Sequence, residues 1–171
     1  MRIILLVFSI AIVVSSCMKQ RNAPQAELIT QRSEPPAVPR GTDTMLYYSR
    51  GACFGMCPIF DFTLMKDGRA IYNGKNHVDR IGRYQALIDI TEAEKVLRKA
   101  NEIGYFQLKT EYDNPNVHDL PDIHTGIAHE GHLHRVRNRY KGPAALRMVY
   151  AELDSLIARQ SWSLVGVPKA E

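Results

Sequence analysis

Residues 59–73, IFDFTLMKDGRAIYN, have the pattern of a β-hairpin. Phe60, Phe62 and Leu64 alternate with other side chains, which is the period-two pattern of a strand with one buried face. Lys66-Asp67-Gly68 then supplies a turn, since glycine adopts the backbone conformations that hairpin turns require. Two strands joined by so short a turn pair antiparallel, so this segment predicts an antiparallel sheet.

Further strands are predicted on both sides of this hairpin. Residues 45–49 and 80–88 are rich in β-forming side chains. Residues 123–129 and 132–139 predict a second hairpin around the two-residue turn Glu130-Gly131. Two segments lack strand and helix signals and are predicted loops, residues 50–58 and 109–121.

Two helices complete the predicted domain. Thr91 and Glu94 have the spacing of a capping box, and Gly104 is a suitable residue to end that first helix. Gly142-Pro143 is predicted to start the second helix, because proline is tolerated in a first turn. The predicted buried stripe of the second helix consists of Leu146, Val149, Tyr150, Leu153, Leu156 and Ile157. The predicted fold class is α+β, a mostly antiparallel sheet with two helices packed on it.

The N-terminus has the pattern of a lipoprotein signal peptide over residues 1–16. Arg2 gives a positive start, an apolar run continues to Val14, and two serines precede Cys17. The run of about 12 residues spans about 18 Å as a helix, less than the roughly 30 Å core of a bilayer. A stable transmembrane span is therefore not favoured. Because a cysteine follows the small residues directly, Cys17 is predicted to be lipidated, and an ordinary secreted protein and an uncleaved anchor are the alternatives.

The rest of the chain divides into a tether, a domain and a tail. Residues 17–43 contain the lipidated cysteine and a proline-interrupted segment without apolar periodicity, which predicts a disordered tether. Residues 44–163 are the predicted globular domain, and residues 164–171 a loose C-terminal tail. The predicted location is the bacterial cell envelope, with the domain anchored to a membrane by lipid and facing the periplasm or the exterior.

The charge distribution argues against nucleic acid as a partner. The whole chain has a formal net charge of +4, but residues 44–163 contain 16 Lys and Arg against 14 Asp and Glu. A nearly neutral domain does not attract phosphate chains over its whole surface. The predicted partners are the membrane, through the lipid anchor, and an envelope protein or peptidoglycan.

The segment Cys53-Phe54-Gly55-Met56-Cys57-Pro58, followed by an aromatic strand and Asp67-Gly68, resembles an uncharacterised bacterial family, domain of unknown function 6438. The resemblance continues in Asp119-Leu120-Pro121 and in Tyr140, Gly142-Pro143 and the leucine-rich helix after them. It covers roughly residues 44–163. Members of this family are commonly exported or lipid-anchored. The resemblance implies no established activity.

Cys53 and Cys57 are an even pair in a compartment that favours disulfides. Gly55 helps the chain to turn between them, so the favoured interpretation is a local structural disulfide. A redox dithiol is one alternative. A copper site is another, because the motif also resembles the thiolate pair of copper-delivery proteins, although there a helix rather than a strand follows the motif.

Three histidines surround the predicted turn of the second hairpin. Strand alternation places His129, His132 and His134 on one face, where they are candidate ligands for zinc or copper. The alternative is an exposed hairpin tip with polar side chains. The sequence otherwise predicts no cofactor.

More than one role is also open for the charged residues in and near the second hairpin. Arg135, Arg137 and Arg139 alternate on the opposite strand face, which is either solvated or contacts lipid headgroups or an acidic ligand. The preceding segment offers several oxygen ligands but lacks the spacing of a calcium loop, so turn formation is the favoured role. These oxygen-bearing residues are Asp113, Asn114, Asn116, Asp119 and Asp122.

The sequence favours a non-catalytic protein over an enzyme, because it contains no G-x-S-x-G elbow, phosphate-binding glycine loop or H-E-x-x-H motif. The predicted function is a binding or envelope-associated module. The alternative is a lipoprotein that handles thiols or metal through Cys53, Cys57 and the three histidines.

Overall fold

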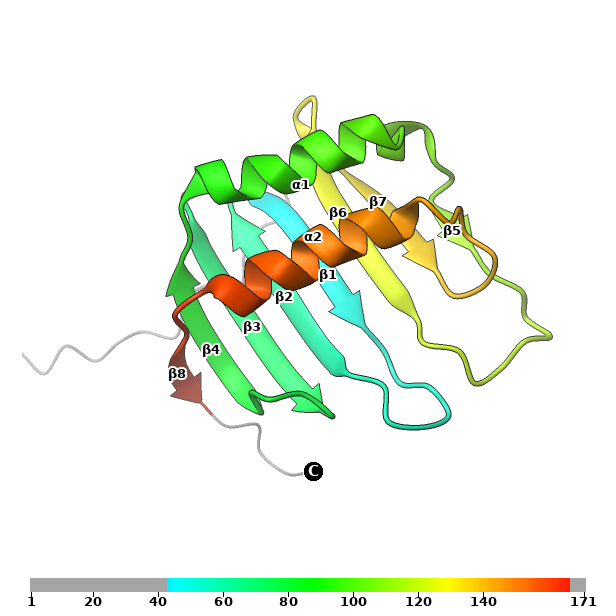
Figure 1. Cartoon of the computed structure of the whole chain (residues 1–171), viewed down its shortest axis with the longest axis horizontal. Coiled ribbons are helices and arrows are strands. Elements are labelled where there is room, and N and C mark those ends of the chain that lie inside the picture. The colour runs from blue at the N-terminus through cyan, green and yellow to red at the C-terminus, as the bar shows by residue number, and fades with distance from the viewer. Residues whose placement is uncertain (1–42, 167–171) are drawn as a thin grey trace, which may run out of the picture. The chain divides into compact units, whose positions relative to one another are not determined.

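The computed structural model describes residues 43–166, which form one eight-stranded sheet and two α-helices (Figure 1). The helices are joined to the sheet by short connections, and a single 3₁₀ turn follows the first of them. The elements in chain order are β1 (Thr44–Arg50), β2 (Ile59–Met65), β3 (Arg69–Asn76), β4 (Gly82–Leu87), α1 (Ile90–Glu102), η1 (Tyr105–Gln107), β5 (Glu111–Tyr112), β6 (Ile123–His129), β7 (His132–Asn138), α2 (Leu146–Arg159) and β8 (Ser163–Gly166).

The sheet has the strand order β5-β7-β6-β1-β2-β3-β4-β8. All neighbouring strands pair antiparallel except β5 and β7, which are parallel. Figure 1 shows α1 and α2 side by side across one face of this sheet. The predicted α+β class, with two helices packed on a mostly antiparallel sheet, is confirmed.

The hydrophobic core lies between the sheet and the two helices. Leu46, Tyr48 and Phe62 are fully buried on the strands, and Val96 of α1 is buried against them. All six residues of the stripe predicted for α2 are buried, from Leu146 to Ile157. Burial of each such side chain contributes about 1.5–3 kcal/mol, which makes this layer the main source of stability.

Both helices begin at residues other than those predicted. Asp89, rather than Thr91, caps α1, since its side chain accepts a hydrogen bond from the Thr91 amide at 2.9 Å. Gly104 has the left-handed conformation expected after the helix, with φ of 64°. Helix α2 begins at Leu146, because the preceding residues from Pro143 form a tighter turn whose carbonyls accept bonds from amides three residues ahead.

Two short edge strands were not predicted. Residues 109–121 were expected to be a loop, but β5 pairs with β7 through hydrogen bonds from the Arg137 and Arg139 amides to the Thr110 and Tyr112 carbonyls. Residues 164–171 were expected to be a loose tail, whereas β8 pairs with β4. Trp162 fixes the start of β8, because its ring packs near Phe62 and Tyr72 in the core.

The predicted signal peptide (1–16), the predicted lipidation site Cys17 and the predicted tether (17–43), apart from Asp43, lie outside the described residues, as do residues 167–171. Within residues 43–166, neither helix is long and apolar enough to cross a membrane.

Candidate functional site

The loop between β1 and β2 is closed by a disulfide between Cys53 and Cys57, whose Cα atoms are 5.8 Å apart. Two backbone hydrogen bonds attach it to the segment before β6. The Gly51 amide donates to the Asp122 carbonyl at 2.8 Å, and the Phe54 amide donates to the Asp119 carbonyl at 3.2 Å. The disulfide loop (residues 51–58) and the neighbouring segment 119–122 therefore form one continuous surface, although they are far apart in the sequence.

Large apolar side chains project from this surface. Phe54 is 88% exposed and Met56 is 84% exposed, while Leu120 on the neighbouring segment is 37% exposed. An open cleft of about 350 Å³ lies between the two segments, and its lining includes Cys53, Phe54 and Leu120. Exposed apolar side chains beside a cleft are typical of sites that bind another molecule.

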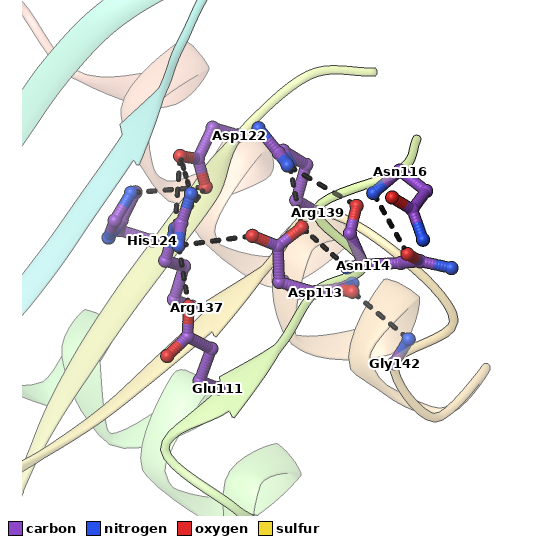
Figure 2. A network of polar contacts seen from close by, with 10 residues as sticks. Glu111, Asp113, Asn114, Asn116, Asp122, His124, Arg137, Arg139 and Gly142 are labelled. Atoms are coloured by element: carbon purple, nitrogen blue, oxygen red, sulfur yellow. Dashed lines mark hydrogen bonds and ion pairs between the residues drawn. The ribbon is translucent and has the colours of Figure 1, made fainter. Parts of the chain in front are cut away.

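A polar network includes Asp122 of this surface (Figure 2). Arg137 of β7 contacts Asp122 through Nε and Nη2, at 2.8–3.0 Å, and Glu111 through Nη1 at 2.5 Å. Arg137 Nη1 also lies 3.3 Å from Asp113. Arg139 Nε donates to Asp113 at 2.6 Å, so two neighbouring arginines hold the segment between β5 and β6.

The pKa values of these groups agree with strong pairing. Burial, the largest single effect, raises the pKa of Asp122, but the hydrogen bonds and electrostatic effects of Arg137 and His124 together outweigh it, so the net pKa is lowered. Burial also raises the pKa of Asp113, and hydrogen bonds from Arg139 and the Asn114 amide reverse it. The hydrogen bonds to Asp122 raise the pKa of Arg137. All three side chains are therefore charged near neutral pH.

The network also decides between the interpretations of the charged residues. Turn formation is confirmed for Asp113 and Asn114, whose side chains accept hydrogen bonds from the amides of Asn114 and Asn116. Arg137 and Arg139 have protein carboxylates as partners, so neither is simply solvated. No local pattern signals these pairs, because the two partners lie 15 residues apart in one pair and 26 in the other.

Residues 44–157 match a protein family described as domain of unknown function (DUF6438). The chain belongs to this family. No curated protein matches the chain. The matched range extends from β1 almost to the end of α2, so the disulfide loop and the segment 119–122 both lie within the DUF6438 domain. The two motifs by which the sequence resembled this family, around Cys53 and around Asp119, are in contact in the structure.

The predicted histidine cluster lies on one face of the DUF6438 domain. His129 pairs with His132, and His134 follows on the same side of β7. The turn between them has the positive φ angles of a two-residue hairpin turn, 48° at Glu130 and 82° at Gly131. In the range 43–166, however, no three His, Cys, Asp or Glu side chains are grouped so that they could hold a metal ion.

Two of the three histidine rings contact aromatic side chains of η1. His129 stacks on Phe106, with ring centroids 3.9 Å apart. His134 lies edge-on to Tyr105, with centroids 5.4 Å apart. Burial lowers the pKa of His134, and among residues 43–166 its buried Nε2 atom has no hydrogen-bond partner. The imidazole of His134 therefore serves as a neutral part of the packing.

Proposed function

We propose that this protein is a lipid-anchored, non-catalytic module of the bacterial envelope that binds a protein partner through its disulfide loop. The observation that carries the proposal is the exposure of Phe54 and Met56 on a loop that is closed covalently. The lipid anchor at Cys17 and the extracytoplasmic location are part of the proposal. They are supported by the signal-like N-terminal sequence and by the compartment that a disulfide requires.

The loop is suited to binding because it is held in place before a partner arrives. The disulfide fixes the ends of a five-residue segment, and the Phe54 amide is bonded to the neighbouring segment. Ordering a flexible loop on binding costs free energy, so a fixed loop retains more of the contact energy. Phenylalanine offers a large rigid contact surface, and methionine adapts its shape to the partner.

The neighbouring cleft gives the partner a second point of contact. It lies beside Phe54 and is lined by Leu120 as well as by the polar residues His118 and Asp119. A partner with a protruding side chain would insert it here while its apolar surface covers Phe54 and Met56. Interfaces of this kind depend on a few central apolar contacts surrounded by polar residues.

Site-specific photocrosslinking in living cells tests this proposal. A photoreactive phenylalanine analogue is placed at position 54 of the full chain, and the same analogue at position 87 is the control. Leu87 is also well exposed, at 78%, but lies on β4 away from the disulfide loop. A protein crosslinked specifically from position 54 is identified by mass spectrometry and purified.

Binding of the purified partner then provides the decisive comparison. We expect Phe54→Ser to weaken binding at least about tenfold, equivalent to about 1.4 kcal/mol, and Leu87→Ser to change it less than about twofold. The same crosslinked species from both positions, or equal loss of affinity in both variants, would contradict the proposal. So would the absence of any species specific to position 54.

A further inference from the structure

A second cavity, of about 450 Å³, lies at the N-terminal end of α2, and four cationic side chains line it. They come from separate parts of the chain: the end of β1, the segment after β7 and the first turns of α2. One carboxylate, that of Asp154, is also in the lining. The four cations are Arg50, Arg139, Lys141 and Arg147.

Two of these cations are held rigidly by other groups. Arg50 Nη2 lies 2.6 Å from Asp154, and its Nε donates to the Tyr48 hydroxyl at 2.5 Å. Arg139 is held by Asp113, as described above. A guanidinium has five N–H donors, so each arginine keeps donors that these bonds do not use. Their positions are thus fixed while part of their bonding capacity remains.

The other two cations have no anionic partner within the described part of the chain. Lys141 and Arg147 are both exposed. The Lys141 ammonium lies 5.0 Å from the centre of the Tyr140 ring, which does not neutralise its charge. Even after the pairing carboxylates Asp113 and Asp154 are counted, the lining retains an excess of positive charge.

The backbone adds to this positive potential. Helix α2 is 14 residues long, and Ala145 at its start supplies no side-chain cap. The amides of Leu146, Arg147 and Met148 donate to carbonyls three residues earlier, so the helix contributes through its dipole, whose N-terminal end is positive. The positive end of the helix dipole and the four cations therefore act on the same cavity.

We infer that this cavity binds a phosphate group, either as free phosphate or as the headgroup of an anionic phospholipid. Arginine side chains recognise phosphate oxygens through paired donors, and lysine adds a compact charge. A phosphate dianion matches an excess of positive charge better than a single carboxylate does. The cavity shares Arg139 with the cleft beside Phe54, but Arg50, Lys141 and Arg147 do not line that cleft, so this inference goes beyond the proposed function.

The test uses the full-length protein in a non-ionic detergent at constant ionic strength. Binding of inorganic phosphate, of short-chain phosphatidylglycerol and of short-chain phosphatidylcholine is measured by calorimetry. The variant Lys141→Gln/Arg147→Gln removes the two unpaired cations. The control, Arg98→Gln, removes one exposed cation from α1, where it lies 3.8 Å from Glu94 in the same helix.

We expect saturable phosphate binding that weakens at least about tenfold in the double variant and less than about twofold in Arg98→Gln. Tighter binding of phosphatidylglycerol than of phosphate identifies a lipid headgroup as the ligand, and the reverse order identifies free phosphate. The inference is overturned if no probe binds saturably, if phosphatidylcholine alone binds, or if the double variant binds as tightly as the native protein. None of these outcomes depends on the crosslinking result at position 54.

Discussion

Arg137 contacts both carboxylate oxygens of Asp122, with Nη2 2.8 Å from Oδ2 and Nε 3.0 Å from each oxygen. The main-chain carbonyl of Asp122 accepts the amide hydrogen of Gly51. A side chain of β7 therefore fixes the segment to which the disulfide loop is attached. The position of Phe54 and Met56 depends on this arginine, although neither residue touches it.

Replacing Arg137 by glutamine should destabilise the domain and loosen the disulfide loop. The variant loses charge-assisted bonds to Asp122 and Glu111 and leaves the partly buried Asp122 without its main partner. Because the arginine side chain is 30% exposed, we expect a loss of about 1–2 kcal/mol in the free energy of unfolding. Urea denaturation measures the loss, and hydrogen exchange at the Gly51 amide reports the loosening.

Arg98→Gln is the matched control for this prediction. Its ion pair with Glu94 is 3.8 Å long and its side chain is 64% exposed. We expect a change below about 0.5 kcal/mol. Equal destabilisation by both substitutions would show that the Arg137 network has no special structural role.

The carboxylates of the network should make stability depend on acid pH. The folded-state pKa of Asp122 is below its usual value of 3.8, because the hydrogen bonds and electrostatic effects of Arg137 and His124 together outweigh burial, the largest single effect. A lowered pKa contributes stability above the unfolded-state value, and this contribution is lost as the pH falls through the folded-state value. The unfolding free energy of the native protein should therefore be higher than that of Asp122→Asn, and this difference should be largest above about pH 4. A difference that stays constant down to about pH 2 would contradict this pairing.

Replacement of both cysteines by serine should leave the domain folded but less stable. The disulfide closes a loop between residues four positions apart, which corresponds to about 2 kcal/mol in the chain-entropy estimate. Urea denaturation of the native protein and of Cys53→Ser/Cys57→Ser measures the difference. Thiol labelling of the exported native protein is the companion experiment, since freely reactive thiols would favour a redox role over a structural one.

Protonation of His134 should reduce the free energy of unfolding at mildly acidic pH. Burial lowers its folded-state pKa below the usual value of 6.5, so protonation opposes folding. Its favourable contribution is present above the unfolded-state pKa and is lost as the pH falls through the folded-state value. The unfolding free energy of the native protein should decline relative to that of His134→Phe between about pH 7 and pH 5. The charges of His132 and His129 also lower the pKa of His134, so the control is His118→Gln, at an exposed position outside this group, which should leave the pH dependence unchanged.

Local sequence patterns were sufficient for most elements of the sheet. The hairpin around Asp67-Gly68 and the hairpin around Glu130-Gly131 were both predicted from strand alternation and a glycine turn, and both are present. The buried stripe of α2 was also predicted, because apolar side chains recur there at the helical period. In each case the signal lies within about a dozen consecutive residues.

The edge strands and the polar network had no such signal. Strand β5 has two residues and β8 has four, and each is ordered by pairing with a strand distant in the sequence. A role in turns accounted for the presence of Asp113 and Asp122 in the sequence, so their pairing with Arg139 and Arg137 was not predicted. The prediction of helix starts failed for a related reason, since the cap depends on the backbone conformation of Asp89 as well as on residue type.

The sequence by itself determined the α+β class, the two hairpins and the buried faces of β2 and α2, because these follow from local periodicity and turn chemistry. Tertiary structure decided which segments meet. Strand order brings β1, β6 and β7 together, so the disulfide loop, the segment 119–122 and Arg137 form one surface. It also gathers Arg50, Arg139, Lys141 and Arg147 around one cavity. Contacts between residues distant in sequence depend on packing of the whole chain, which no short stretch encodes.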